Sequence, residues 1–189
     1  HHKTIGIGWV KKTEPLCENH YSIVTPDGGV AMDFAKIHPF SYGEEHEHFQ
    51  GGTTLCTGTL GEFRAGLGIC YDLRFPEQFR AMVPKTEFFI VPANWPESRV
   101  SHWKALLAAR AIENQCYVVG VNCCGDMDGQ YYSGDSGLYA PDGSLLVPTK
   151  EIRLTDALCK EEKLLVYDIQ NDVAKIRKAF PVLQDRKEI

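Results

Sequence analysis

The sequence predicts an α/β layered fold, and three observations support that class. Strand-like and helix-like segments alternate along the 189 residues. Two of the strand-like segments, residues 87–93 and 116–122, are almost entirely apolar, as strands buried on both faces of a sheet are. Between them, residues 101–114 repeat apolar side chains at helical spacing. This order favours helices packed on sheets.

The first half of the chain is predicted to consist of strands joined by turns and a loop. Residues 5–10 and 21–25 are strand-like, and the second of these ends at a Pro-Asp-Gly turn. Residues 30–37 are predicted to be extended. The polar, glycine-punctuated residues 39–54 are predicted to be a loop, and residues 63–69 a short apolar strand.

The second half is predicted to add helices to the strands. Residues 76–82 begin with proline and glutamate, which favour a first helical turn. A hairpin is expected over residues 136–148 around a second Pro-Asp-Gly turn, then a strand over 163–169 and a short helix over 172–178. No linker, repeat or charge block marks a boundary, so residues 1–189 are predicted to be a single domain.

The composition is typical of a soluble globular chain, with 43% hydrophobic and 24% charged residues. The net charge of −5 disfavours nucleic-acid binding, which usually requires a basic face. No apolar run reaches the ~18 residues that a membrane helix needs. No signal peptide is visible. We therefore expect a cytoplasmic protein without nucleic-acid or membrane partners.

The seven cysteines include no CxxC pair, which disfavours structural zinc and thioredoxin chemistry. They are predicted to be reduced and mostly buried. Cys70 is nevertheless a candidate nucleophile, because it ends an apolar strand a few residues before a predicted helix. Such a corner exposes a side chain, and the amide that follows it, here Tyr71, can bind an oxyanion. A buried structural cysteine followed by an Asp–Arg pair fits these residues equally well.

Two charged segments lie near predicted strand ends. Lys36 sits among apolar residues; the commoner arrangement points such a lysine into solvent, but beside a cysteine it would lower the thiol pKa and stabilise an oxyanion. Residues 43–49 hold three carboxylates and two histidines without HExxH spacing. A solvated loop is the default interpretation there and a metal site is less favoured. The third option is that one of these glutamates serves a catalytic lysine or a substrate.

Asn94 and Trp95 follow the predicted strand 87–93. Open α/β sheets bind ligands at the carboxyl ends of their strands, so we interpret Trp95 as a substrate-site residue, with a core position as the alternative. Arg110, Glu113 and Asn114 end the following helix and are interpreted as structural or subunit contacts.

Taken together and in order, these segments resemble one known family. FAKIHPF, GICYDLRFPE, ANWP, HWKALLAARAIENQCYVVGVN and YYSGDSGLYAPDGSLL are similar to the carbon–nitrogen hydrolase (nitrilase) superfamily, and most similar to its omega-amidase-like branch. The set spans nearly the whole chain. The resemblance implies a four-layer α-β-β-α sandwich that commonly pairs into homodimers. It implies neither an organic cofactor nor a metal.

The resemblance also implies a reaction that depends on a Glu-Lys-Cys triad. Cys70 is then the nucleophile that attacks an amide carbonyl, ammonia is the first product, and water hydrolyses the thioester. Lys36 and the Tyr71 backbone N–H stabilise the oxyanion, and Glu45 matches an auxiliary glutamate that orients the lysine or the substrate. Asn94 and Trp95 are expected to contact a small carboxylate-bearing amide, such as an omega-amide of a 2-oxo acid.

One expected element has no counterpart in the sequence. In the family, the general-base glutamate belongs to an opening strand–helix unit before the strand that matches residues 5–10. Glu14 and Glu18 lie in a different stretch and do not replace it. The expectation is therefore an N-terminally incomplete domain, either part of a longer polypeptide or a truncated and impaired chain.

Two alternatives to an amidase remain open. A non-catalytic binding or assembly member is favoured by the missing glutamate, whereas the intact set of Lys36, Glu45 and Cys70 argues against it. A nitrilase, carbamoylase or acyltransferase of the same superfamily is equally compatible with the residues around Cys70.

Overall fold

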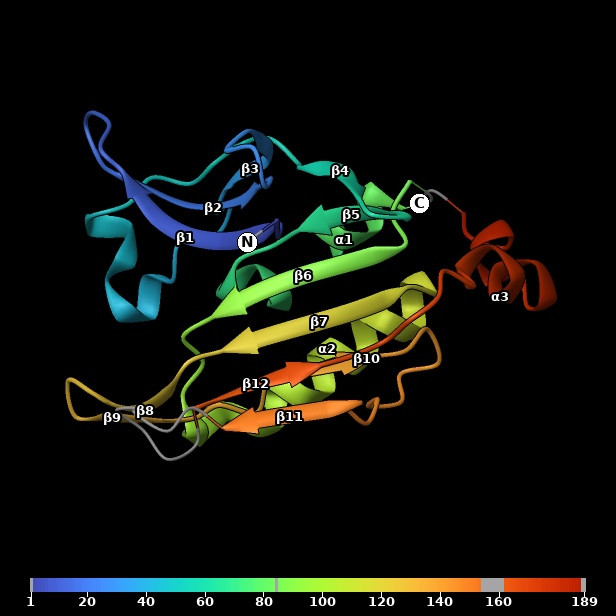
Figure 1. Cartoon of the computed structure of the whole chain (residues 1–189). Coiled ribbons are helices and arrows are strands. Elements are labelled where there is room, and N and C mark those ends of the chain that lie inside the picture. Colours follow the sequence, from blue (N-terminus) through green and yellow to red (C-terminus); the bar gives the residue numbers. More distant parts are fainter. Residues whose placement is uncertain (1, 84, 154–161, 188–189) are drawn as a thin grey trace.

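The computed structural model describes residues 2–83, 85–153 and 162–187. Two sheets stack on each other, and helices α1 (Pro76–Met82) and α2 (Val100–Asn114) lie behind the larger one (Figure 1). The described residues thus form helix, sheet and sheet layers, which confirms the predicted α/β class.

The smaller sheet is an antiparallel meander of three strands. Its order is β1 (Ile5–Lys11), β2 (Glu18–Val24) and β3 (Val30–Ala35), joined at one end by the predicted Pro-Asp-Gly turn, in which Gly28 has a φ of +86°. All seven residues of β1 are exposed, so this strand forms an uncovered edge.

The larger sheet has the order β10-β7-β6-β5-β4. Its centre is parallel: β5 (Phe63–Leu67) pairs with β6 (Phe88–Ala93), which pairs with β7 (Tyr117–Asn122). The edge strands β4 (Thr57–Leu60) and β10 (Gly137–Tyr139) are antiparallel to their neighbours. The carboxyl ends of β5, β6 and β7 therefore meet at one edge of the sheet.

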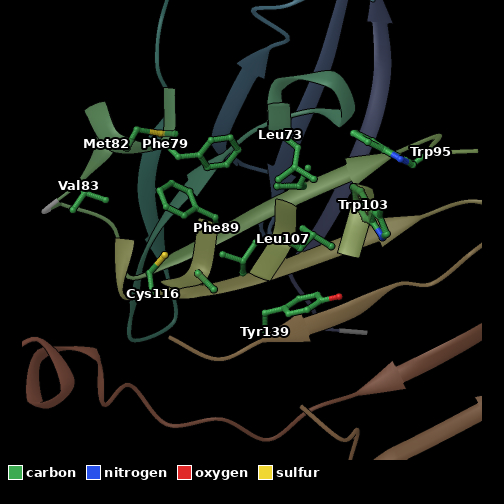
Figure 2. Close-up of a cluster of buried hydrophobic side chains, with 13 residues drawn as sticks. Leu73, Phe79, Met82, Val83, Phe89, Trp95, Trp103, Leu107, Cys116 and Tyr139 are labelled. Atoms are coloured by element: carbon green, nitrogen blue, oxygen red, sulfur yellow. The ribbon is translucent and has the colours of Figure 1, made fainter. Parts of the chain in front are cut away.

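One hydrophobic cluster joins the larger sheet to its helices (Figure 2). Phe89 and Val91 of β6 face Phe79 of α1 and Trp103 and Leu107 of α2, and all five side chains are fully buried. Full burial of each such side chain contributes roughly 1.5–3 kcal/mol to folding. The strand alternation then sends Ile90 to the opposite face.

A second cluster joins the two sheets. Ile23 of β2 and Met32 and Phe34 of β3 pack on Leu67 of β5 and Ile90 of β6. Phe34 and Leu67 are 1% and 0% exposed, so the residue that follows β3 and the residue that follows β5 are held close to this shared core.

The remaining elements flank the large sheet. They are β8 (Cys124–Met127) with β9 (Gln130–Ser133), β11 (Lys150–Arg153) with β12 (Lys163–Val166), and α3 (Val173–Ala179), whose Val173 is fully buried. Short 3-10 turns cover Ser41–Gly43, Glu45–Glu47, Cys70–Arg74, Glu97–Arg99 and Val182–Gln184. Among the described helices, none is long and apolar enough to cross a membrane.

Most predicted elements are confirmed, and the differences have local causes. Strands β4, β8, β9 and β11 were not predicted, because their short polar or glycine-containing sequences carry no buried alternation. The hairpin predicted over 136–148 is confirmed around its turn, where Tyr139 bridges Leu145 antiparallel and backbone hydrogen bonds join Ala140 to Ser144 and Leu146 to Leu138, although the second arm is too short to form a full strand. The expectation of mostly buried cysteines is also wrong, since Cys116 alone is buried among the six described cysteines.

Candidate active site

Cys70 lies at the edge where the parallel strands end. It follows β5 and opens the 3-10 turn Cys70–Arg74, as the predicted strand-to-helix corner requires. Its φ is +47°, a left-handed conformation that L side chains rarely adopt. Such strain costs about 1–3 kcal/mol and is found most often at functional sites. Tyr71 is the next residue of this turn, so the first backbone N–H after Cys70 is that of Tyr71.

Lys36 and Glu45 form a buried ion pair beside this corner. Lys36 follows β3, and its Nζ lies 2.5 Å from Glu45 Oε2. The two side chains are only 5% and 17% exposed. Glu45 also accepts hydrogen bonds from the Phe40 backbone N–H at 2.7 Å and from Asn19 Nδ2 at 3.2 Å. The third option for loop 43–49, a glutamate that serves the lysine, is therefore the arrangement found.

The histidines of that loop do not form a metal site with these groups. His46 and His48 are exposed, and the described residues contain no group of three or more potential ligands arranged around a metal position.

A cavity of about 460 Å³ brings the three predicted catalytic side chains together. It lies between the carboxyl ends of β5 and β6 and the first two strands of the smaller sheet. Its lining consists of Gly8, Trp9, Val10, Asn19, His20, Tyr21, Lys36, Phe40, Glu45, Ile69, Cys70, Pro92, Ala93 and Asn94. Glu45 contributes the only carboxylate to this part of the described structure.

Charge and burial act in opposite directions on the Cys70 thiol. Burial raises its pKa, whereas the charge of the Lys36 ammonium lowers it. The thiol donates a hydrogen bond to the Asn94 carbonyl, 3.8 Å from Sγ. Burial wins, so the net pKa lies above the ordinary value. Lys36 acts in the predicted direction without making Cys70 a thiolate at neutral pH.

The ionised form of Glu45 is favoured despite its burial. Burial alone would raise the pKa of this carboxyl, but the hydrogen bond and charge of Lys36 together hold the pKa below its usual value. Lys36 therefore faces a carboxylate at neutral pH, which fixes the ammonium beside the cavity.

Two arginines border a smaller hollow on the other side of Cys70. Arg74 lies 4.8 Å from the centre of the Trp95 ring, and Arg99 lies 5.7 Å from the centre of the Phe40 ring. Both line this hollow of about 40 Å³ with Cys70 and Asn94. Within the described part of the chain, neither arginine has a carboxylate partner. Neither arginine was among the predicted site residues. The four-residue spacing from Cys70 to Arg74, which is compatible with one helical turn, was the available signal for Arg74.

The core position, which was the alternative for Trp95, is the one that the structure shows. Its side chain is 3% exposed and belongs to the helix-facing cluster, where its ring centre lies 5.4 Å from that of Trp103 (Figure 2). One edge still lines the hollow beside Cys70. Asn94 is exposed and lines both cavities. Contact of either residue with a substrate remains a prediction.

Asp72 and His38 form a hydrogen-bonded network next to the corner. Asp72 is fully buried, and its Oδ1 accepts hydrogen bonds from the His38 backbone N–H at 2.9 Å and from His38 Nδ1 at 2.8 Å. Its Oδ2 accepts the Ile69 backbone N–H at 2.9 Å. The alternative interpretation included an Asp–Arg pair here, and the structure has a different arrangement: Asp72 bonds to histidine, while Arg74 lies over Trp95.

Glu14 and Glu18 lie away from the cavity, as expected. Glu14 is exposed. Glu18 bonds to His20 at 3.0 Å, to Gln50 at 3.2 Å and to Lys11 at 3.2 Å, and these contacts, that of His20 first, lower its pKa to about 2. Neither carboxyl lines either cavity beside Cys70.

Arg110 and its neighbours have structural contacts, in line with their interpretation. Arg110 is buried and donates to the Leu73 carbonyl at 2.7 Å and to Glu113 at 3.0 Å. These bonds tie α2 to the turn that carries Cys70.

Comparison with known proteins finds one family. A family model described as carbon-nitrogen hydrolase matches residues 2–178. The chain is 31% identical to 2-oxoglutaramate amidase of Bacillus subtilis (strain 168), covering 100% of this chain and 70% of that protein. It is 36% identical to omega-amidase YafV of Escherichia coli (strain K12), covering 94% of this chain and 66% of that protein.

A solved structure has the same arrangement over the whole chain. XC1258 of Xanthomonas campestris, described as a CN-hydrolase superfamily protein with an arsenic adduct in the active site, aligns with a TM-score of 0.85 at 31% identity. The alignment covers 100% of this chain and 71% of that one. The chain thus spans about two thirds to 70% of these related proteins.

Proposed function

Because the chain belongs to the carbon–nitrogen hydrolase family, we propose that it is an amidase that uses Cys70 to release ammonia from small carboxylate-bearing amides. The observation that carries this proposal is the single cavity that holds Cys70 and the Lys36–Glu45 pair. A nucleophile at a strained corner, next to a fixed cation, is the arrangement that acyl transfer needs.

In the first step, Cys70 Sγ attacks the carbonyl carbon of the amide as its S–H proton leaves. The carbonyl oxygen becomes an oxyanion, which the Lys36 ammonium and the Tyr71 backbone N–H stabilise. Glu45 holds the Lys36 ammonium in place. Collapse of this intermediate breaks the C–N bond, and the nitrogen takes up the proton released by the Cys70 thiol and departs as ammonia.

In the second step, water attacks the carbonyl carbon of the thioester. The same two donors stabilise the second oxyanion, the C–S bond breaks, and the sulfur regains a proton. The products are the carboxylic acid and the free thiol. Removal of one donor to such an oxyanion costs about 10²–10³ in kcat.

The two arginines support a substrate that carries its own carboxylate. Arg74 and Arg99 line the hollow beside Cys70 while lacking a carboxylate partner among the described side chains. Guanidinium groups favour bidentate pairing with carboxylates. Related proteins named 2-oxoglutaramate amidase and omega-amidase agree with this class. The proposed substrates are therefore omega-amides of 2-oxo acids, with Asn94 and Trp95 as neighbouring contacts.

One observation favours a second candidate, a member with little or no catalysis of its own. Both steps need a base, yet the only carboxylate in the described lining of the Cys70 cavity is already paired with Lys36. The net pKa of Cys70 is also raised. Such a chain would act by binding or assembly.

Ammonia release from 2-oxoglutaramate distinguishes these candidates. The amidase proposal predicts release by the 189-residue chain that disappears in Cys70→Ala. Propionamide, a nitrile and a carbamoyl amide serve as matched alternative substrates. Equal release by both chains contradicts the proposed nucleophile, and preference for the nitrile or the carbamoyl amide contradicts the proposed substrate class. Binding of 2-oxoglutaramate without release favours the second candidate.

We further propose that residues 1–189 act as one cytoplasmic domain that pairs with a second copy. The family match over residues 2–178 supports the single domain. Light scattering after size-exclusion chromatography tests the pairing, and fractionation of cells tests the location.

A further inference from the structure

We propose that Asp72, together with His38, is a positioning residue that holds the Lys36 segment against the Cys70 corner. This inference rests on the proposed function only in its choice of Cys70 as the nucleophile. The network joins two segments that lie 34 residues apart in the chain.

The contacts of Asp72 connect both sides of the site. Oδ1 accepts two bonds from His38, which is two residues beyond Lys36, and Oδ2 accepts the N–H of Ile69, which directly precedes Cys70. Backbone bonds from Asp72 N–H to the Ile69 carbonyl at 3.0 Å and from Phe75 N–H to the Asp72 carbonyl at 3.0 Å close the turn. One carboxylate thus fixes the Lys36 segment relative to the strained cysteine.

His38 has little freedom to move. A carboxylate only accepts hydrogen bonds, so the imidazole donates from Nδ1 to Asp72. The ring stacks on Phe75, with centres 3.8 Å apart and planes at 11°. Phe75 itself lies at the end of the Cys70 turn. The imidazole is therefore held by the middle and by the end of the same turn.

The charge of Asp72 does not help Cys70 to ionise. A carboxylate near Cys70 raises the pKa of the thiol and so opposes thiolate formation. Lys36 lowers that pKa, and its effect is larger than the effect of Asp72. Loss of a residue that acts only through its charge lowers the thiol pKa. Loss of a residue that keeps Lys36 in place raises it.

The test is whether loss of Asp72 raises or lowers the pKa of the Cys70 thiol. Iodoacetamide alkylation of Cys70, followed by mass spectrometry from about pH 6 to pH 11, gives the thiol pKa without requiring turnover. We expect Asp72→Asn to raise the pKa by up to about 1 unit. In the Lys36→Met background, the same substitution lowers the pKa, because only the loss of charge remains.

Three further variants separate positioning from general damage. His38→Ala raises the pKa in the same direction, and His38→Asn, whose amide nitrogen can replace Nδ1, restores it. Asp33→Asn is the matched control, because Asp33 bonds to His20 and Ser22 and has no contact with Cys70. If Asp72→Asn does not fold, the His38 pair alone decides.

An unchanged or lowered pKa in Asp72→Asn, or in His38→Ala where that pair decides, overturns the inference. The ammonia assay, by contrast, tests the proposed function. A chain that releases no ammonia still yields the pKa of its thiol, so the two failures are distinguishable.

Discussion

The Lys36 ammonium lies 2.5 Å from the Glu45 carboxylate, and little of either side chain reaches solvent. A buried pair of this kind is costly to break from one side, because the remaining charge stays buried without a partner.

Lys36→Met should therefore damage both stability and catalysis. We expect the free energy of unfolding in urea to fall by about 3–5 kcal/mol, because Glu45 is left unpaired. The kcat for ammonia release should fall about 10²–10³-fold through loss of the oxyanion cation. Lys36→Met/Glu45→Gln removes the stranded charge and should recover stability but not activity.

The matched control for this pair is Lys11→Met. Lys11 is 49% exposed and pairs with Glu18 at the surface, so its loss should cost less than about 1 kcal/mol. Equal destabilisation by both methionine variants would contradict the assigned burial of the Lys36 pair.

Cys70 should become more reactive as the pH rises. Its pKa is raised above the ordinary value because burial outweighs Lys36. The thiolate fraction therefore grows through and beyond the usual range near ~8.5, and alkylation should not level off at that pH. A plateau below about pH 8 would show an activated thiol instead. Cys116, which is fully buried, serves as the internal control and should stay unmodified in the folded chain.

Arg74→Gln and Arg99→Gln should discriminate between substrates. Each variant should raise KM for 2-oxoglutaramate about tenfold to a hundredfold, because a charge-assisted hydrogen bond contributes about 1.5–3 kcal/mol. The KM for propionamide, which has no carboxylate, should change little. Parallel losses for both amides would mean that the arginines shape the hollow rather than recognise charge.

Gly120→Ala should destabilise the helix-facing cluster. A Cβ at Gly120 would lie 2.5 Å from Leu107 Cδ1 and 2.5 Å from Trp103 Cζ2. Overpacking of this kind costs about 1–3 kcal/mol, measurable by urea unfolding. Gly8→Ala on exposed β1, where the nearest atom is 3.9 Å away, is the control and should cost far less.

Glu18 should make the free energy of unfolding depend on pH in acid. Its pKa falls from 4.5 to about 2 in the folded chain, so its stabilising effect is complete above pH 4.5 and disappears as the pH falls toward 2. Glu18→Gln should lower stability at neutral pH and converge with the parent chain in strong acid. Glu44→Gln, at an exposed position, should leave the profile unchanged.

Sequence patterns identify elements whose burial is continuous or periodic. The predicted helix over residues 76–82 coincides with α1, and the apolar run over 116–122 differs from β7 by one residue. Strands such as β8 and β9 cannot be predicted from such patterns, because their residues are at most partly buried. Their pairing depends on a turn rather than on a hydrophobic face.

The site was predictable in part for a related reason. The local sequence around Cys70 predicts a strand-to-helix corner, and the residues around Lys36 already made it a candidate. The resemblance then assigned roles to Lys36 and Glu45. The Asp72–His38 bonds could not be predicted, because they join segments whose approach is set by packing between the sheets. The arginines were missed because a guanidinium over an aromatic ring has no fixed sequence spacing.

The left-handed backbone at Cys70 sets the stability of this protein against its proposed activity. Glycine adopts that conformation without steric conflict, so Cys70→Gly would relieve a load of about 1–3 kcal/mol. That is a sizeable share of the roughly 5–15 kcal/mol that separates a folded domain from its unfolded chain. Directed evolution scored by heat resistance alone should therefore enrich this substitution, and every clone that carries it will lack the sulfur on which turnover is proposed to depend.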